Sequence, residues 1–478
     1  MDRQRTIFSA LTSSVLWMQL FSILLCLAFI PACGGGGGGG GDVQPPPPTA
    51  STAVQFRIGD ASSDRLVSVE ATVEDIFLTN SQGTSYKVVP VSHQLEFTHL
   101  NGTLHPLYVS DVIQGTYKQL AIDGRDLHIS YLDQQGNAQE YAFTGTTRIP
   151  VTLNPPLVVG SQPMIVSLDF DLASSISVDP FSELEPIVDP VFTVSSTPVA
   201  TSQQQQPEDG AVEDVVGKVD AVSTGGAIAI LGRDNSGLTF ETDSNTRYSY
   251  KDTPMGSAPM TVVRIEGITR PDNSLLATKV DGLIDSNGTV IEGLYLWYAG
   301  YTGNKEMFVI AQEGIGSSLF YQEGALGSKL RVNITNAAYG IDTSGMDMSG
   351  LNFTTANIAP GSRVRIHSDN PFIHGDYSTT TNLVADKVVL EKQTVTGLVM
   401  NYQAGPPVQF DLRLPLDGSS FLQLVRPIAW SVHVYQQPGT TLKNLTGVQN
   451  NDTVNVRGLL FTDPVNSSYH LVAQRIWK

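Results

Sequence analysis

The sequence predicts an all-β protein, in which an N-terminal β-sandwich precedes three small β-barrels. Stretches such as "VSVEATV" (67–73), "MIVSLDFDL" (164–172) and "TVNVRGLL" (453–460) alternate apolar and polar residues. They are bounded by Gly, Asn, Asp or Pro, as is typical of half-buried antiparallel strands. Charged residues make up only 15 % of the chain, and we find no sustained helical periodicity after residue 53. A signal that recurs three times in the last half of the chain predicts tandem units.

The N-terminus predicts a secretory signal. Arg3 and Arg5 precede an almost wholly apolar stretch over residues 15–30. A signal peptide consists of a charged start, an apolar segment and a small residue before the cleavage site. A transmembrane helix is the alternative, but sixteen residues span only about 24 Å of a hydrocarbon core that is ~30 Å thick. The residues "IPAC" that end at Cys33 resemble a bacterial lipoprotein lipobox. This resemblance implies cleavage after residue 32 and a lipid on Cys33.

A flexible tether follows Cys33. Eight glycines (34–41) and four prolines (45–48) form a low-complexity stretch. Glycine chains are flexible, and proline chains form stiff extended spacers, so residues 33–52 are expected to hold a folded body away from a membrane. By the sorting rule of such lipoproteins, glycine after the lipidated cysteine implies the outer membrane.

Alternation predicts the strands of the sandwich over residues 53–176. They are expected at Val54–Ile58, Leu66–Leu78, Tyr86–Val89, Tyr117–Ile122, Leu127–Leu132, Gln139–Phe143 and Met164–Leu172. The stretches "FRIGDASSDRLVSVEATVEDIFL" (56–78), "LEFTHLNG" (95–102), "VIQGTYKQLAI" (112–122) and "LDFDLASSI" (168–176) resemble a family of bacterial lipoprotein domains, domain-of-unknown-function family 4382. The resemblance implies a transthyretin-like or immunoglobulin-like sandwich and no particular activity.

An acidic segment separates the sandwich from the repeats. Residues 169–214 hold ten acidic residues and no Lys or Arg. Self-repulsion and proline favour an extended, solvated linker over 177–212. The alternative is a weak divalent-cation site, because Asp169 and Asp171 would share one face of a strand.

The tandem units are defined by a repeated pattern. It occurs in "TVVRIEGITRPDNSLLATKVDGL" from Thr261, "SRVRIHSDNPFIHGDYSTTTNLVADKVVL" from Ser362 and "DTVNVRGLLFTDPVNSSYHLVAQRIWK" from Asp452. Equivalent alanines (Ala277, Ala385, Ala473) and opening-strand glycines (Gly217, Gly293, Gly397) recur in all three. The units, 213–285, 286–391 and 392–478, resemble domain-of-unknown-function family 5666, which implies a barrel like the oligonucleotide/oligosaccharide-binding fold. The middle unit carries an insertion over about 340–358.

Composition excludes several functions. The formal charge is −18, and removal of residues 1–32 leaves 26 basic and 45 acidic residues, a net −19. Such acidity disfavours nucleic acid as a partner. Without Cys26 only Cys33 remains, so the mature chain has no internal disulfide. The motifs HExxH, CxxC and GxSxG do not occur, and we expect no catalytic residue, metal or cofactor.

One aromatic cluster is the candidate binding patch. The segment "LYLWYAGY" (294–301) contains Tyr295, Trp297, Tyr298 and Tyr301. Strand alternation places Tyr295 and Trp297 on one face and Tyr298 on the other. One face could be barrel core, and the other could stack on a sugar or peptide.

The expected function is therefore that of a lipid-anchored envelope protein that binds a glycan or an envelope protein without catalysis. The alternatives are a structural spacer and an enzyme that acts on envelope polysaccharide. A shallow patch would favour binding, a deep cleft with two carboxylates would favour the enzyme, and a flat apolar face would favour the spacer.

Overall fold

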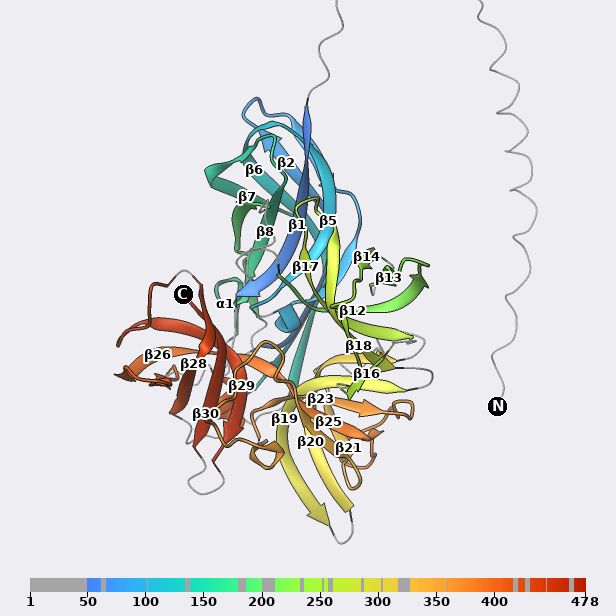
Figure 1. The fold of residues 1–478 in the computed structure, drawn as a ribbon, viewed down its shortest axis with the longest axis vertical. Helices are drawn as coiled ribbons and strands as arrows, with labels where there is room; N and C mark the ends of the chain where they lie inside the picture. Colours follow the sequence, from blue (N-terminus) through green and yellow to red (C-terminus); the bar gives the residue numbers. More distant parts are fainter. Residues whose placement is uncertain are drawn as a thin grey trace, which may run out of the picture. The chain divides into compact units, whose positions relative to one another are not determined.

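The structure is a computed structural model, and the folded part described below lies within the unit Thr49–Lys478. It describes residues 50–61, 66–100, 102–133, 138–178, 186–199, 211–232, 236–251, 253–256, 261–284, 288–301, 304–316, 327–358, 360–415, 420–425, 430–443, 445–463 and 468–478 (Figure 1). The predicted signal peptide, Cys33 and all but the last residues of the tether lie outside this description. In the described part, no helix is long and apolar enough to cross a membrane.

The all-β fold class is confirmed, and two sheets form the N-terminal sandwich (Figure 1). The first has the order β11-β8-β1-β5, and the second runs β3-β2-β6-β7 with β4 beside β2. Their bounds are β1 Ser51–Ala61, β2 Leu66–Asn80, β3 Ser85–Val89, β4 His93–Glu96, β5 Leu104–Ile113, β6 Gly115–Leu132, β7 Ala138–Val159, β8 Met164–Asp171 and β11 Phe192–Pro198.

Strand alternation builds the sandwich core. Val54, Phe56 and Ile58 of β1 are fully buried, and they pack in one apolar cluster with residues of the facing sheet such as Ile76. β1 lies between antiparallel β5 and parallel β8. Because β1 is covered on both edges, its apolar residues are removed from water more completely than those of an edge strand.

The acidic segment differs from the linker that we expected at 177–212. After the short α1 (Leu172–Ser175), β9 (Ile176–Ser177) pairs with β10 (Ile187–Val188). β11 then pairs antiparallel with the whole length of β8, so the sandwich extends to Pro198. The cause is the alternation of Phe192 and Val194, both of which pack against the sandwich core.

Hydrogen bonds from Ser174 explain the position of the Asp171 carboxylate without a bound cation. The carboxylate accepts hydrogen bonds from the backbone N–H of Ser174, at 2.9 Å, and from the Ser174 hydroxyl, at 2.7 Å. It therefore caps the N-terminus of α1, a role that Asp often takes.

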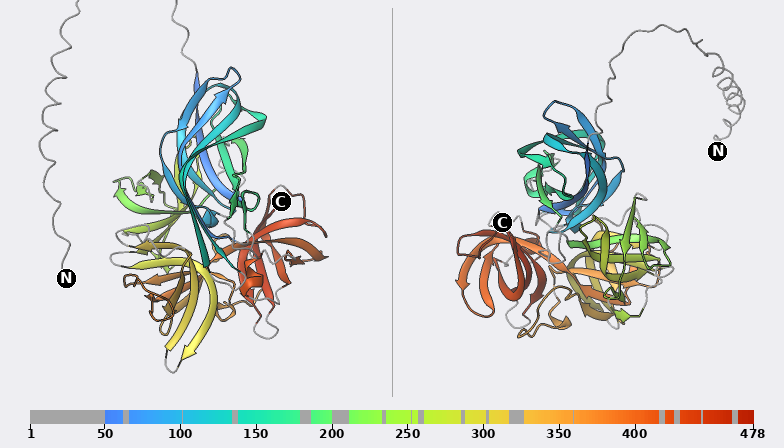
Figure 2. Two further views of the ribbon diagram at one scale, coloured as in Figure 1. Left: turned by 180° about the vertical axis from the view of Figure 1, so that it is seen from behind. Right: turned by 45° about the horizontal axis from the view of Figure 1, so that its top comes forward.

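Three five-stranded barrels follow, and all have the same strand order. If the five barrel strands of each unit are numbered in chain order, their order around the barrel is 1-2-3-5-4, and strand 4 pairs with strand 1. The third and fifth strands pair in parallel: β14 with β18, β21 with β24, and β28 with β30. Figure 2 shows the third barrel, in orange and red, closing on itself.

The strand bounds show where each barrel is built. The first has β12 Ala211–Val222, β13 Ile228–Leu231, β14 Gly237–Glu241, β17 Val262–Thr269 and β18 Leu275–Ile284, with β15 Arg247–Tyr250 and β16 Thr253–Met255 beside it. The second has β19 Thr289–Tyr301, β20 Asn304–Gly316, β21 Lys329–Asn333, β23 Arg363–Ser368 and a last strand divided into β24 Leu383–Val384 and β25 Lys387–Leu390, with β22 Ala338–Ile341 beside it. The third has β26 Lys392–Gln403, β27 Val408–Arg413, β28 Ser431–Lys443, β29 Thr453–Thr462 and β30 Tyr469–Trp477, with α3 Phe421–Val425.

A buried ion network joins the three barrels. Arg264 of β17 lies 3.2 Å from Asp214 of β12 and 3.2 Å from Glu391, which follows β25. Asp214 also pairs with Arg457 of β29 at 3.0 Å. Asp342, after β22, lies 3.5 Å from Arg264 and 3.3 Å from Lys392 of β26. One network thus contains charges from every barrel.

The sandwich is also in contact with the barrels. Arg57 of β1 is fully buried, and its guanidinium donates to the carbonyl of Ala211 at 3.0 Å and to the hydroxyl of Thr269. Asn273 donates to the carbonyl of Ala53 at 3.2 Å. Val67 and Leu132 of the sandwich also belong to an apolar cluster that contains residues of the second and third barrels, so the contact is both polar and apolar.

Candidate functional site

The predicted aromatic patch is divided between two environments. Tyr295 is buried in the core of the second barrel, whereas Trp297 is 40 % exposed. The register of β19 against β20 shifts between these two residues. This bulge breaks the alternation that would have placed them on one face, so that part of the prediction is wrong. Tyr298 and Tyr301 lie on β19, and their side chains are outside the described residues.

Trp297 already has aromatic and cationic neighbours. Its ring stacks on Phe308 of β20, with centroids 4.9 Å apart, and the ammonium of Lys329 lies 5.8 Å from it. Tyr377 packs edge-on against Phe308 at 6.2 Å. Of the patch side chains that the structure describes, only Trp297 is open to a ligand.

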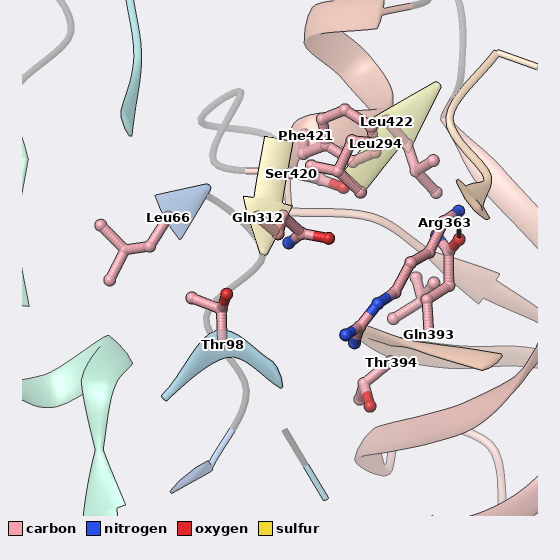
Figure 3. Close-up of a pocket in the computed structure, with 11 residues that line it drawn as sticks. Leu66, Thr98, Leu294, Gln312, Arg363, Gln393, Thr394, Ser420, Phe421 and Leu422 are labelled. Atoms are coloured by element: carbon pink, nitrogen blue, oxygen red, sulfur yellow. Dashed lines mark hydrogen bonds between the residues drawn. The ribbon is translucent and has the colours of Figure 1, made fainter. Parts of the chain in front are cut away.

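A small cavity of about 60 Å³ lies where the sandwich meets the second and third barrels. Figure 3 shows Leu66 and Thr98 on one side and Arg363, Gln393 and Phe421 on the other. Gln312 donates to the carbonyl of Val67 at 3.0 Å. Arg363 pairs with Glu292 at 2.9 Å. These polar groups are used to hold the barrels and sandwich together, and the space suits water rather than a ligand.

The third barrel carries a row of polar side chains across three strands. Asp411 of β27 lies opposite His433 of β28, and His433 lies opposite His470 of β30. Val432 and Leu471, which are the sequence neighbours of His433 and His470, are fully buried in the barrel. Strand alternation therefore turns the polar row to the outer face, which we call the histidine face.

Hydrogen bonds order the histidine face. His433 Nδ1 lies 2.8 Å from Asp411 Oδ1. His470 Nδ1 lies 3.1 Å from the hydroxyl of Tyr435, and its Nε2 lies 2.8 Å from Ser468 Oγ. The imidazole rings of His433 and His470 have centroids 5.7 Å apart. His433 Nε2 also lies 3.3 Å from Gln409 Oε1, so each of the two rings is held from two sides.

The surroundings of His470 favour the neutral form of its imidazole. Burial, with a further contribution from His433, lowers the pKa of His470 below its ordinary value of 6.5. A neutral imidazole has one N–H donor and one acceptor nitrogen. It therefore donates to one of Tyr435 and Ser468 and accepts from the other.

The histidine face opens into a shallow cavity of about 340 Å³. The lining residues are Asp411, Ser431, His433, Tyr435, Ser468, Tyr469 and His470. They include two serines, two histidines, two tyrosines and one aspartate, and none is Lys or Arg. In the described part of the chain, no group of three or more His, Cys, Asp or Glu side chains is placed to hold a metal ion.

Our sequence reading missed this site. The signals were the alternations His433-Val434-Tyr435 and Ser468-Tyr469-His470, which place polar side chains on one face of each strand. The parallel pairing of β28 with β30 brings the two stretches together. Each stretch alone is indistinguishable from a solvated strand face.

The fold and the site define an all-β protein with a sandwich, three five-stranded barrels and a shallow cavity on the outer face of the third barrel. Comparison with known families finds that residues 216–290 match the model described as "Domain of unknown function (DUF5666)". The match spans the first barrel and the start of the second, and it supports the resemblance on which the tandem units were predicted. No curated protein matches the chain.

Proposed function

We propose that the protein is a lipid-anchored component of the bacterial cell envelope that binds a neutral glycan, without catalysis, on the histidine face of its third barrel. The apolar segment 15–30 and the lipobox-like residues before Cys33 support the anchor. The sequence resemblance to domain-of-unknown-function family 4382, a lipoprotein family, supports the same location, and Gly34 favours the outer membrane.

The observation that carries the binding role is the chemistry of the shallow cavity. Sugar hydroxyls donate and accept hydrogen bonds at once, and sugar rings present C–H faces to aromatic surfaces. The cavity offers Asp411 and Ser431 as polar partners and the rings of His433 and Tyr435 as a platform. Its volume, about 340 Å³, is within the range of about 300–1,000 Å³ that ligand sites have.

Charge favours a neutral ligand over nucleic acid. Residues 392–478 hold 7 basic and 4 acidic residues, but none of the basic ones lines the cavity. A phosphate backbone needs Lys or Arg to neutralise it, and Asp411 would repel it. The mature chain as a whole is acidic, which also opposes nucleic acid.

An enzyme is the second candidate, and one contact favours it. Ser468 Oγ lies 2.8 Å from His470 Nε2, and Tyr435 orients the same ring from the other side. A hydroxyl beside a neutral imidazole that a third group orients is the arrangement of an activated nucleophile. The spacer alternative draws its support from the ion network that joins the barrels.

Affinity electrophoresis and calorimetry with chitohexaose, maltohexaose and dextran test the binding role. We expect at least one of them to bind, and Asp411→Ala and His433→Ala to weaken that binding at least tenfold. His128→Ala, which removes an exposed histidine of the sandwich, is the matched control. Binding that both cavity variants retain would contradict the proposed site. Release of shortened sugars that Ser468→Ala abolishes would favour the enzyme instead.

The anchor is tested by Cys33→Ala. We expect the wild-type protein to partition with membranes and to carry the added mass of a lipid. The variant should appear as a soluble protein or as an uncleaved precursor, because no thiol remains to be acylated. Identical mass and identical partitioning of the two proteins would refute the lipid anchor.

A further inference from the structure

A second cavity, of about 290 Å³, lies inside the N-terminal sandwich and is distinct from the histidine face. It lies where the sheet of β2, β6 and β7 faces the hairpin of β9 and β10 and strands β8 and β11. Its lining residues are Ala71, Thr72, Val73, Phe97, Ile122, Gly124, Arg125, Leu127, Tyr141, Phe143, Gly145, Thr147, Ile149, Phe170, Pro186, Val188, Pro190 and Phe192.

One wall of this cavity is a distorted part of the sheet. Two of the shifts in the register of β2 against β6 lie here, one between Glu70 and Thr72 and one between Val73 and Asp75. The register of β6 against β7 shifts between Arg125 and Leu127. Bulges of this kind bend a sheet and are frequent beside binding sites. Here they lie beside the residues that line the cavity.

The opposite wall is aromatic. Phe170 stacks on Phe192, with ring centroids 4.6 Å apart, and Phe97 packs edge-on against Phe170 at 5.1 Å. These rings support one another, so the wall is stable without a ligand. At the mouth, Phe143 is 44 % exposed although it is a large apolar side chain. An exposed aromatic ring beside an apolar cavity gives a ligand a contact surface.

The polar groups of the cavity favour an uncharged ligand head. Among the described residues that line the cavity, only Arg125 is charged, and its guanidinium is paired with Glu74, at 2.6 Å, and with Asp126. Two carboxylates beside one guanidinium leave a net negative surrounding that repels a fatty-acid carboxylate. The hydroxyls of Thr72 and Thr147 can hydrogen-bond an alcohol or an ester without a net charge.

The size of the cavity sets the length of the ligand. An apolar cavity of about 150 Å³ accommodates benzene, which has six carbon atoms. A cavity of about 290 Å³ is about twice as large. It therefore suits an apolar group of about a dozen carbons.

We propose that this cavity binds one acyl chain of about twelve carbons from a neutral single-chain lipid, such as a monoacylglycerol. Burial of the chain removes apolar surface of the ligand and of the aromatic wall from water at once. The proposal does not depend on the glycan site, because the two cavities share no residue.

Gly124→Leu is the decisive variant. Gly124 lines the cavity, and a Cβ built on it would meet only the carbonyl oxygen of Thr72, at 3.7 Å. A leucine there should fill the cavity without straining the strand. Gly115→Leu is the matched control, because Gly115 lies on the same strand, is exposed and has no atom within 4 Å of its Cβ position.

The experiment is calorimetric titration of the full-length protein, freed of non-covalently bound lipid, with 1-monododecanoylglycerol and with dodecanoate. Both ligands are used at concentrations below those at which they form micelles. We expect the monoacylglycerol to bind with a negative heat-capacity change, the mark of apolar burial. Dodecanoate should bind at least tenfold more weakly. Gly115→Leu should bind like the wild type, and Gly124→Leu should lose binding while unfolding at the same or higher urea concentration.

Three results would overturn the proposal: no binding of the monoacylglycerol, unchanged binding by Gly124→Leu, or tighter binding of dodecanoate. If Gly124→Leu fails to fold, Phe143→Ala is used in its place, because the exposed ring of Phe143 at the mouth contributes little to the packing of the core. That variant should then weaken monoacylglycerol binding at least threefold, and unchanged affinity would count against the site.

Discussion

Two of the repeated alanines, in the first and third barrels, lie opposite a glycine on the neighbouring strand. Ala277 lies opposite Gly267 in the first barrel, and Ala473 lies opposite Gly458 in the third. A Cβ on Gly267 would lie 2.4 Å from the carbonyl oxygen of Leu276, and one on Gly458 would lie 2.0 Å from that of Val472. In both barrels the two strands approach too closely for these glycines to carry a side chain, and the close contact is with backbone atoms.

Gly458→Ala should therefore destabilise the third barrel. The new methyl group would contact backbone, which cannot move aside as a flexible side chain can. We expect the free energy of unfolding to fall by about 1–3 kcal/mol, the usual cost of overpacking. Urea unfolding followed by circular dichroism measures it. Gly447→Ala in the same barrel is the control, because no atom lies within 4 Å of its Cβ position. Equal midpoints for the two variants would contradict the close-contact explanation.

At the scale of elements, the insertion in the second unit supports its neighbour. It supplies Met346, Met348, Leu351 and Phe353, which pack against a buried cluster on the third barrel. The sequence marked residues 340–358 as an insertion, but its composition does not indicate what it covers. The spacing of these apolar residues changes from two to three and back to two, so it follows neither a strand nor a helix over the whole segment, and contact with another unit explains their burial.

Phe353 connects this insertion with the histidine face. Its ring stacks on Phe461 with centroids 4.6 Å apart and lies 5.6 Å from the ring of His470. We expect Phe353→Ala to lower the free energy of unfolding by about 1–3 kcal/mol, because it removes a stacked pair and its buried area.

The same substitution should shift the NMR resonances of the His470 imidazole, and Phe353→Leu should have an intermediate effect. Ile373→Ala is the control, since Ile373 is 52 % exposed. If His470 is unaffected by Phe353→Ala, the insertion does not support the face.

β11 shows the limit of reading elements from sequence. Its residues alternate, but they lie in a segment without basic residues, and its composition favoured a linker. The strand forms because β8 offers an unpaired edge next to it. An edge that belongs to another part of the chain cannot be seen in a local pattern, and so tertiary pairing overrode the composition.

At the scale of the whole molecule, the ion network joins the three barrels to one another. Burial alone would raise the pKa of Asp342, but Lys392, Arg264 and Lys279 hold that pKa well below its ordinary value of 3.8. Because these cations come from the first and third barrels, the carboxylate of the second barrel stabilises the assembled molecule.

Asp342→Asn should destabilise the protein in a pH-dependent way. At pH 7 it leaves buried cations without their counter-charge, at a cost of about 3–5 kcal/mol. The folded-state pKa is lowered, so the contribution of Asp342 is present above the unfolded-state pKa and is lost as pH falls through the folded-state value. The difference between variant and wild type should be full at pH 7 and 5 and should shrink below pH 4.

Urea unfolding at pH 7, 5 and 3 tests this dependence. The control is Asp220→Asn, which removes an exposed carboxylate of β12. A difference that stays constant down to pH 3 would mean that Asp342 acts through packing rather than charge.

The sequence by itself determined the fold class, the tandem repeat and most strands of the sandwich. These features depend on local alternation, on glycine where backbones approach and on turn residues, all of which can be recognised from consecutive residues of the chain. The match of residues 216–290 to a family model also depends on such local pattern.

Tertiary structure alone decided the sites. The bulge in β19 separated Tyr295 from Trp297, and the pairing of β27, β28 and β30 assembled Asp411, His433 and His470. Distances between residues that are far apart in sequence depend on register and closure, which many different sequences share. A binding site is made of such distances, and for this reason the strands of this protein could be predicted from its sequence but its cavities could not.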